Sequence, residues 1–173
     1  MKPLLGTFVL ICLSAFAAVT QEQPKLAVTL SAERSSYALH DDVQLVVVRE
    51  NTGGRSISVP REWGWGVQRT NIRVFDAKGN EVRTSFLADE LPPPPQPYDF
   101  VLLGSGDFLG THVSDAATRF VNEPGEYEFV VEYTSYLSED YAKRVLKLPP
   151  DVPFWSRERG TITSNRLKLH ISR

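Results

Sequence analysis

The clearest pattern in the chain is a period of two between apolar and polar residues near its C-terminal end. Aromatic and branched residues alternate with glutamates over 126–133, and leucine and isoleucine alternate with basic residues over 166–171. Successive side chains of a β-strand point to opposite faces, so each run predicts a half-buried strand. The outward positions are acidic in the first run and basic in the second, so we predict that the two strands are paired neighbours.

Other stretches of the chain repeat this pattern. Alternation over 26–31 and 70–75 predicts two more half-buried strands, and the run Val-Gln-Leu-Val-Val-Val at 43–48 predicts a central strand buried on both faces. The segment 35–42 has the composition of a turn, and a glycine-containing loop at 76–80 is predicted to close a hairpin. Further short strands are predicted at 56–59, 81–85, 100–103 and 108–112.

The predicted elements determine the fold class. A helix of any length fits only 139–148, which ends before two prolines. About seven to nine short strands, separated by turns and without alternating helices, predict an all-β antiparallel β-sandwich over residues 24–173. The expected core contains the inward residues of five strands: Leu26, Val28, Leu45, Val47, Ile72, Val74, Tyr127, Phe129, Val131, Leu167, Leu169 and Ile171.

The strand that starts with Pro124-Gly125-Glu126-Tyr127 carries a resemblance. Immunoglobulin-type sandwiches often place a tyrosine at the start of the penultimate strand, where its hydroxyl bonds back to the preceding loop, and Tyr127 has that position. The order of Arg-Glu-Asn-Thr (49–52), Ile-Ser-Val (57–59), the 72–82 hairpin and this tyrosine strand resembles bacterial immunoglobulin-like domains of the intracellular proteinase inhibitor type and other exported bacterial sandwiches. The resemblance implies an immunoglobulin-like sandwich and, for the inhibitor type, a loop that blocks a proteinase.

The first 18 residues have the composition of a signal peptide. Lys2 precedes an apolar run over 4–18, and Ala15 and Ala17 supply small residues at the spacing that a signal peptidase recognises. The run is short for a membrane span, which needs about 20 apolar residues. We therefore predict an exported protein, periplasmic or secreted, without a membrane span in the mature chain. Its one cysteine, Cys12, lies in the removed segment, so the mature chain is expected to lack disulfides and thiolate metal sites.

Charge and motifs argue against several classes of function. Nineteen basic and 21 acidic residues give a net charge of −2, which excludes a basic nucleic-acid stripe as the main theme. The three histidines His40, His112 and His170 lack metal-ligand spacing, and no glycine-rich phosphate loop occurs, so we predict no metal and no cofactor. Gly104-Ser105-Gly106 lacks the following helix of a nucleophile elbow, which disfavours a small hydrolase.

Arg61-Glu62-Trp63-Gly64-Trp65-Gly66 is the most unusual local sequence. In an extended chain Trp63 and Trp65 project to the same side, and the glycines let another surface approach closely. One interpretation is an aromatic platform for a sugar ring, a peptide or a partner chain. The alternative is that both tryptophans close one end of the core.

A proline run at 91–98 ends in Tyr98 and stands where the inhibitor family has an aromatic segment. It is expected to adopt the polyproline II conformation, because proline fixes φ and removes the main-chain donor. Such a segment is either a ligand for an aromatic groove or a stiff crossing between the two sheets.

About 30 residues separate the last two predicted strands, far more than a hairpin needs. Long loops on a rigid sandwich often carry recognition, and Trp155 between Arg157 and Arg159 is a candidate for binding an anionic or aromatic partner. The alternative is that Phe154 and Trp155 anchor the loop on the sandwich.

These observations favour a non-catalytic exported binding or assembly module, with a proteinase inhibitor as the alternative and a small hydrolase as a third, unfavoured one. The predicted partner is another protein or a peptide, or else a glycan, and not a nucleic acid. The candidate binding residues are Arg61, Trp63, Trp65, Tyr98, Trp155, Arg157 and Arg159.

Overall fold

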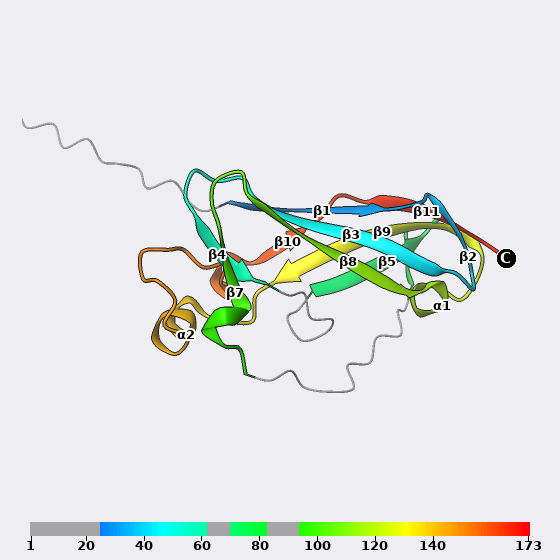
Figure 1. Ribbon diagram of the computed structural model, residues 1–173. Helices are drawn as coiled ribbons and strands as arrows, with labels where there is room; N and C mark the ends of the chain where they lie inside the picture. Colours follow the sequence, from blue (N-terminus) through cyan, green and yellow to red (C-terminus); the bar gives the residue numbers. More distant parts are fainter. Residues whose placement is uncertain (1–24, 62–69, 83–93) are drawn as a thin grey trace, which may run out of the picture.

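The computed structural model describes residues 25–61, 70–82 and 94–173, which form two facing β-sheets (Figure 1). The first sheet has the order β1 (Leu26–Ala32), β3 (Asp42–Asn51) and β8 (Phe108–Ala116). The second has the order β2 (Ser36–Ala38), β11 (Leu167–Ser172), β9 (Gly125–Thr134), β5 (Thr70–Asp76) and β6 (Glu81–Val82), and β10 (Thr161–Thr163) also pairs with β9. The prediction of an all-β, immunoglobulin-like sandwich is confirmed.

The remaining elements are short. β4 (Ile57–Pro60) and β7 (Phe100–Leu103) form a two-stranded sheet of their own. The α-helices are α1 (Ala117–Phe120) and α2 (Glu139–Arg144), and two 3-10 helices, η1 and η2, cover Pro97–Asp99 and Arg157–Arg159. The predicted helix at 139–148 therefore exists but ends earlier, at Arg144.

The N-terminal part of the sandwich contributes to both sheets. β1 pairs antiparallel with β3, whereas β2 pairs parallel with β11, with Tyr37 opposite Ile171. The segment predicted as a turn at 35–42 thus contains a strand, and one strand pair of the sandwich is parallel. The cause is Tyr37, whose ring is buried and whose hydroxyl donates to the Gln44 carbonyl at 3.2 Å.

The central strand β3 differs from its prediction in one respect. It lies between β1 and β8, as expected, but it is not buried on both faces. Burial alternates along it: Val43, Leu45 and Val47 point into the core, while Val46 and Val48 are only half-buried on the outer face. The inward positions continue through Arg49 and Asn51, which are both fully buried.

The predicted core is largely confirmed. Eleven of its twelve residues are buried in one cluster between the sheets, and Leu167 is partly buried against it. The Tyr127 hydroxyl donates to the Glu123 carbonyl at 2.8 Å, so the expected tyrosine corner is present. Phe120 of α1 closes the same end of the core, with its ring edge-on to Phe129 at a centroid distance of 5.5 Å.

The predicted pairing of the acidic and basic strands is also confirmed. β9 and β11 are antiparallel neighbours, with Lys168 opposite Glu128 and His170 opposite Glu126. Ion pairs continue across the outer face of this sheet onto β5 and β6. We call these side chains the charged lattice: Arg73, Glu81, Glu126, Glu128, Glu132, Arg166, Lys168 and His170.

The charged lattice also covers apolar groups of the second sheet. The guanidinium carbons of Arg73 and Arg166 lie 5.1 and 5.3 Å from the centroid of the Phe75 ring. Val130, which is opposite Arg73 in the register, is buried although it points outward. Long arginine stems can bury apolar surface while their charged ends stay in water, and here they seal this face.

We expect the charged lattice to make stability fall in acid. The hydrogen bond from Arg166 lowers the pKa of Glu128 below 4.5, and that from Arg73 does the same for Glu81. A carboxylate whose pKa is lower in the folded state stabilises the fold above its unfolded pKa and loses this effect as the pH falls through the folded value. The urea midpoint should therefore fall as the pH is lowered below about 5, where the unfolded chain begins to bind protons more readily than the folded one.

The matched comparison is between Arg166→Gln and Lys25→Gln. Arg166→Gln should flatten the acid dependence because it removes the cause of the lowered Glu128 pKa. Lys25 is an exposed cation, and no ion pair joins it to the described residues. Its replacement should leave the acid dependence unchanged, and an equal flattening in both variants would contradict this account.

Candidate functional site

The additions to the plain sandwich gather at one end of the molecule (Figure 1). β4, β7, η1 and α2 lie at this end, whereas β2 and α1 lie at the other. We call it the β4–β7 end and define it by residues 55–61, 94–107 and 135–160. It contains the described members of the candidate binding residues, so its construction decides what those residues can do.

A short three-stranded arrangement forms the base of the β4–β7 end. β4 and β7 are antiparallel, with Ser58 opposite Leu102. On the other side of β4, the Ser58 N–H donates to the Pro153 carbonyl at 2.8 Å, and its carbonyl accepts from the Trp155 N–H at 3.3 Å. We call the segment 135–160 the late loop. Its residues 153–155 are thereby attached to β4 as an additional extended segment.

The late loop has a small core of its own. It buries Leu137, Ala142, Leu146, Leu148 and Phe154, with Phe100, Tyr136 and Tyr141 packed against them. The Phe100 and Phe154 rings meet edge-on at 5.5 Å, and the Ser138 hydroxyl caps α2 by accepting from the Tyr141 N–H at 3.1 Å. The loop is therefore a packed unit, with Phe154 as one of its anchors.

Asn51, at the end of β3, connects the loops of the β4–β7 end. Its side-chain nitrogen lies within 3.0 Å of the carbonyl oxygens of Arg55, Leu103 and Gly104. Its side-chain oxygen accepts from the Gly53 N–H at 3.0 Å, and its main chain bonds to Asp107 and Gly106. A single buried amide thus satisfies carbonyls that would be costly to leave unpaired.

Arg49, two residues earlier on the same face, holds the end of β4. Its guanidinium donates to the carbonyls of Pro60 at 2.5 Å and Arg61 at 3.1 Å, and it interacts with Tyr133. Burial lowers the pKa of Arg49 to about 10 and raises the pKa of Tyr133 to about 12. Near neutral pH the arginine therefore keeps its charge and the tyrosine its proton, so carbonyl dipoles and a neutral hydroxyl surround the buried cation.

The three candidate binding residues of the late loop already have contacts within the chain. Trp155 belongs to the main core and is 9% exposed, which is the placement expected if it anchors the loop. Arg159 is half-buried and donates to the Phe154 carbonyl at 3.0 Å. Arg157 is exposed and pairs with Glu158 at 3.1 Å. Trp155 thus presents little indole surface to a ligand.

Arg61 and Tyr98 lie at the far end of β4 and β7, where the main chains of Arg61 and Asp99 meet. The Arg61 N–H donates to the Asp99 carbonyl at 2.6 Å, which extends the β4–β7 pairing by one residue. Both side chains face solvent, and Tyr98 is 74% exposed. Trp63 and Trp65 lie outside the described residues, so the platform interpretation stays a prediction.

Leu102, four residues after Tyr98, was not among the candidate binding residues predicted from the sequence. Leu102 of β7 is 55% exposed. The N–H and C=O of Ser58 bond to 153–155 and not to Leu102, its partner in the register. Hydrogen-bonded and non-bonded pairs alternate in an antiparallel ladder, so Val101 and Leu103 bond to β4. The Leu102 N–H and C=O therefore point away from β4. Among the described residues, β7 pairs only with β4, and its outer edge carries an exposed apolar side chain.

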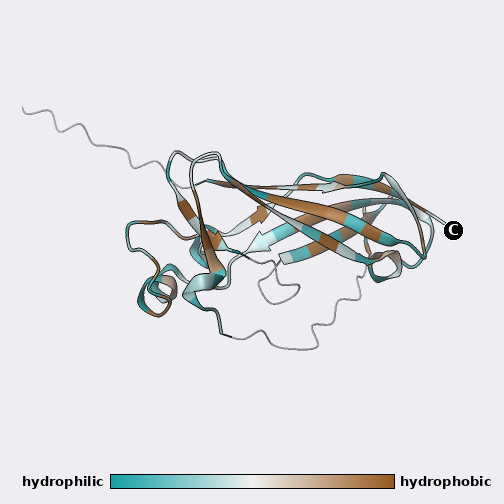
Figure 2. Ribbon diagram, viewed as in Figure 1, coloured by the Kyte–Doolittle hydropathy of each residue, from teal (hydrophilic) through white to brown (hydrophobic). Residues whose placement is uncertain are grey.

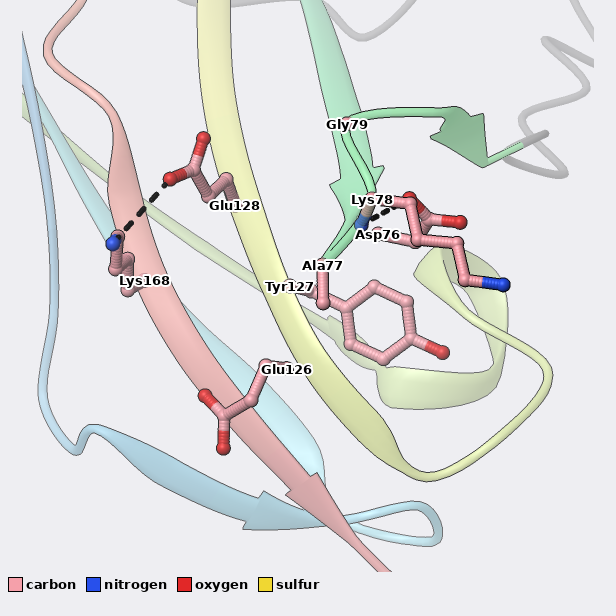
Figure 3. Close-up of a pocket in the computed structure, with 8 residues that line it drawn as sticks. All are labelled: Asp76, Ala77, Lys78, Gly79, Glu126, Tyr127, Glu128 and Lys168. Atoms are coloured by element: carbon pink, nitrogen blue, oxygen red, sulfur yellow. Dashed lines mark hydrogen bonds and ion pairs between the residues drawn. The ribbon is translucent and has the colours of Figure 1, made fainter.

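A hollow lies elsewhere, on the second sheet beside the 76–80 hairpin (Figure 3). Its volume is about 420 Å³, and it is lined by Asp76, Ala77, Lys78, Gly79, Glu126, Tyr127, Glu128 and Lys168. Its carboxylates already have donors: Asp76 accepts from Asn80 and the Lys78 N–H, which lowers its pKa, and Glu128 pairs with Arg166 and Lys168. These contacts stabilise the hairpin and the sheet.

The three histidines lie apart in the described structure. His40 lies in a turn, His112 on β8 and His170 on β11, where it contacts Glu126 at 2.5 Å. Within 25–61, 70–82 and 94–173, no group of three or more His, Cys, Asp or Glu side chains is arranged to hold a metal. No helix in this part of the chain is long and apolar enough to span a membrane.

Solved structures similar to this chain include the CARDB domain of the PF1109 protein from Pyrococcus furiosus, in a crystal structure in complex with di-metal ions (13% identity, TM-score 0.39, covering 86% of this chain and 94% of that chain). The solution NMR structure of the same domain gives 14% identity, a TM-score of 0.40, and coverage of 87% and 97%. A β-glucosidase from Erythrobacter marinus gives 17% identity and a TM-score of 0.36, with 84% of this chain matching 15% of the glucosidase. No protein-family model and no curated protein matches the chain.

We expect Asn51→Ala to destabilise the fold by about 2–4 kcal/mol, because it leaves several buried main-chain groups without a donor or acceptor. Asn165→Ala is the matched control. Asn165 also bonds to main-chain groups, the N–H and C=O of Leu30, but it is exposed, so water can replace it. Its loss should cost about 1 kcal/mol or less. Equal unfolding free energies for the two variants in urea would show that Asn51 has no special role.

Proposed function

We propose that the chain is a non-catalytic binding module that accepts an extended peptide segment of a partner protein along the outer edge of β7. The observation that carries this proposal is that, among the described residues, the Leu102 N–H and C=O at that edge have no strand partner while the side chains of Leu102 and Tyr98 are exposed. An exposed sheet edge is a template for one more strand, and main-chain hydrogen bonds supply the affinity in this mode of recognition.

The side chains around the edge suit such a ligand. Tyr98 and Leu102 offer an exposed aromatic and an exposed aliphatic side chain, and Arg61, whose N–H donates to the Asp99 carbonyl, adds an exposed cation. Tyrosine and arginine are frequent in the energetic centres of protein interfaces. A glycan, which the sequence left open, has no main chain to pair with β7, so the edge favours a peptide.

The rigidity of the β4–β7 end supports the same proposal. Arg49 and Asn51 fix β4, β7 and their loops from inside, and 153–155 fix β4 from the other side. A strand that is already held in the extended conformation loses little conformational entropy when a ligand binds. Export, predicted from the first 18 residues, would place this surface outside the cytosol.

The test uses a library of random linear peptides displayed on phage, selected against the wild-type protein. Selected peptides should bind Leu102→Pro at least about tenfold more weakly, because proline removes the outward N–H and leaves the pairing with β4 intact. Leu102→Ala keeps the N–H but loses the apolar side chain, so its affinity for the peptides should lie between those of the wild type and Leu102→Pro.

Two outcomes would contradict the proposal. One is a selection that yields no peptide with a preference for the wild type over Leu102→Pro. The other is equal binding to both proteins. If Leu102→Pro unfolds, Tyr98→Ala serves instead, since a side chain that is 74% exposed contributes little to the fold; it should weaken binding of the same peptides.

A further inference from the structure

The outer faces of the two sheets differ in their chemistry. The second sheet carries the charged lattice, with four Arg or Lys to Glu ion pairs and the His170–Glu126 contact among the described residues. The corresponding part of the first sheet carries mostly small and uncharged residues. We call it the neutral face and define it by the outward residues of three strands: Ala27, Thr29, Ser31, Gln44, Val46, Val48, Glu50, Phe108, Gly110, His112 and Ser114.

The strand register arranges the neutral face in rows. Thr29, Val48 and Gly110 lie side by side in one row, and Ser31, Val46 and His112 in the next. These two central rows contain no Asp, Glu, Lys or Arg, whereas Glu50 stands in the row at one end and Glu33 beside the row at the other. An uncharged centre with charges at its rim is the usual composition of a protein–protein interface.

The neutral face also lacks the arginine cover of the other sheet. Phe75 on the second sheet lies under Arg73 and Arg166, but Phe108 on the neutral face is 70% exposed. Thr29, Ser31, Gly110 and His112 are exposed as well. The hydrophobic middle of β3 appears as a brown band in Figure 2. Within the described part of the chain, arginine side chains therefore cover one face, and no side chains cover the other in this way.

We propose that the neutral face packs against the neutral face of a second copy of this chain, related by a two-fold axis that crosses the strands above Val47. This rotation places Val48 over Val46 of the second copy and so forms a small apolar centre. It places the exposed ring of His112 over Gly110, which has no side chain to obstruct it. Glu50 then faces Gln44, whose amide can donate to the carboxylate.

The alternative two-fold axis, parallel to the strands, is disfavoured by charge. It would place Glu50 directly over Glu50 of the second copy, and like charges opposed across an interface are destabilising. The register of this face thus favours one of the two simple ways of stacking it on itself, with the strands aligned as in ordinary sheet-on-sheet packing.

The size of the neutral face sets the expected stability of the dimer. Three strands about 4.8 Å apart and seven residues at about 3.4 Å each give a face of roughly 14 by 24 Å. Stacking two such faces removes on the order of 700 Å² from water, less than the roughly 1,200 Å² of a standard stable interface. The dimer is therefore expected to be weak and to form only at high protein concentration.

The test is sedimentation equilibrium of the wild type from about 10 µM to about 1 mM, a range that suits a weak complex. The mean molar mass should rise with concentration toward twice the monomer value. Thr29→Lys puts two lysines into the interface and should weaken association at least about tenfold. Thr163→Lys makes the same change at an exposed threonine on the outer face of the second sheet and should leave association unchanged.

A constant monomer mass up to the highest concentration overturns the proposal, and so does equal weakening by both lysine variants. The stacking is tested by cross-linking in a Cys12→Ser background. A short bis-maleimide, which spans the roughly 10 Å between stacked sheets, should cross-link a mixture of Val46→Cys and Val48→Cys proteins faster than either protein alone, because the rotation pairs these two positions. Equal or faster cross-linking of Val48→Cys alone would contradict the proposed axis.

Discussion

The structure depends on two polar residues that point into the core at the C-terminal end of β3. Val43, Leu45 and Val47 belong to the apolar core, but the next two inward positions are Arg49 and Asn51, and both are fully buried. A buried cation and a buried amide are tolerated only where they are hydrogen-bonded. Here their partners are the carbonyls of Pro60, Arg61, Arg55, Leu103 and Gly104. These five carbonyls belong to β4, β7 and the loops beside them, so the polar end of one strand organises this small sheet, onto which the segment 135–160 is then attached.

The sandwich leaves some of its surfaces closed and others open. The charged lattice seals the outer face of the second sheet with arginine stems and ion pairs. The late loop covers one side of β4 by attaching 153–155 to it. The edge of β7 and the neutral face have no equivalent cover among the described residues, and both carry exposed apolar side chains, Leu102 and Phe108. This division of the surface, rather than any cleft, is what suggests a binding module.

Much of the sandwich could be predicted from the sequence, because alternation specifies both a strand and its inward face. The pairing of β9 with β11 followed from complementary charges, and the tyrosine corner from the position of Tyr127. The binding residues were harder to predict from the sequence. Tryptophan is informative about size and not about exposure, so Trp155 could equally be ligand-binding or core, and it is core. The burial of Arg49 and Asn51 was not predicted, because charged and amide side chains are rarely buried, although the period of two from Val43 leads directly to them. Leu102 was missed because a four-residue apolar run does not reveal which side is open.

Amide hydrogen exchange of the unmodified protein, read residue by residue, tests the central claim most directly. If Arg49 and Asn51 hold the β4–β7 end in place, the N–H groups of Val59, Val101 and Leu103 should exchange as slowly as those in the middle of β3. The outward N–H of Leu102 should exchange quickly when no partner is present. Fast exchange at Val59 and Val101, at the rate of Leu102, would mean that the small sheet opens on its own, and the claim that this end is a prearranged binding edge would fail.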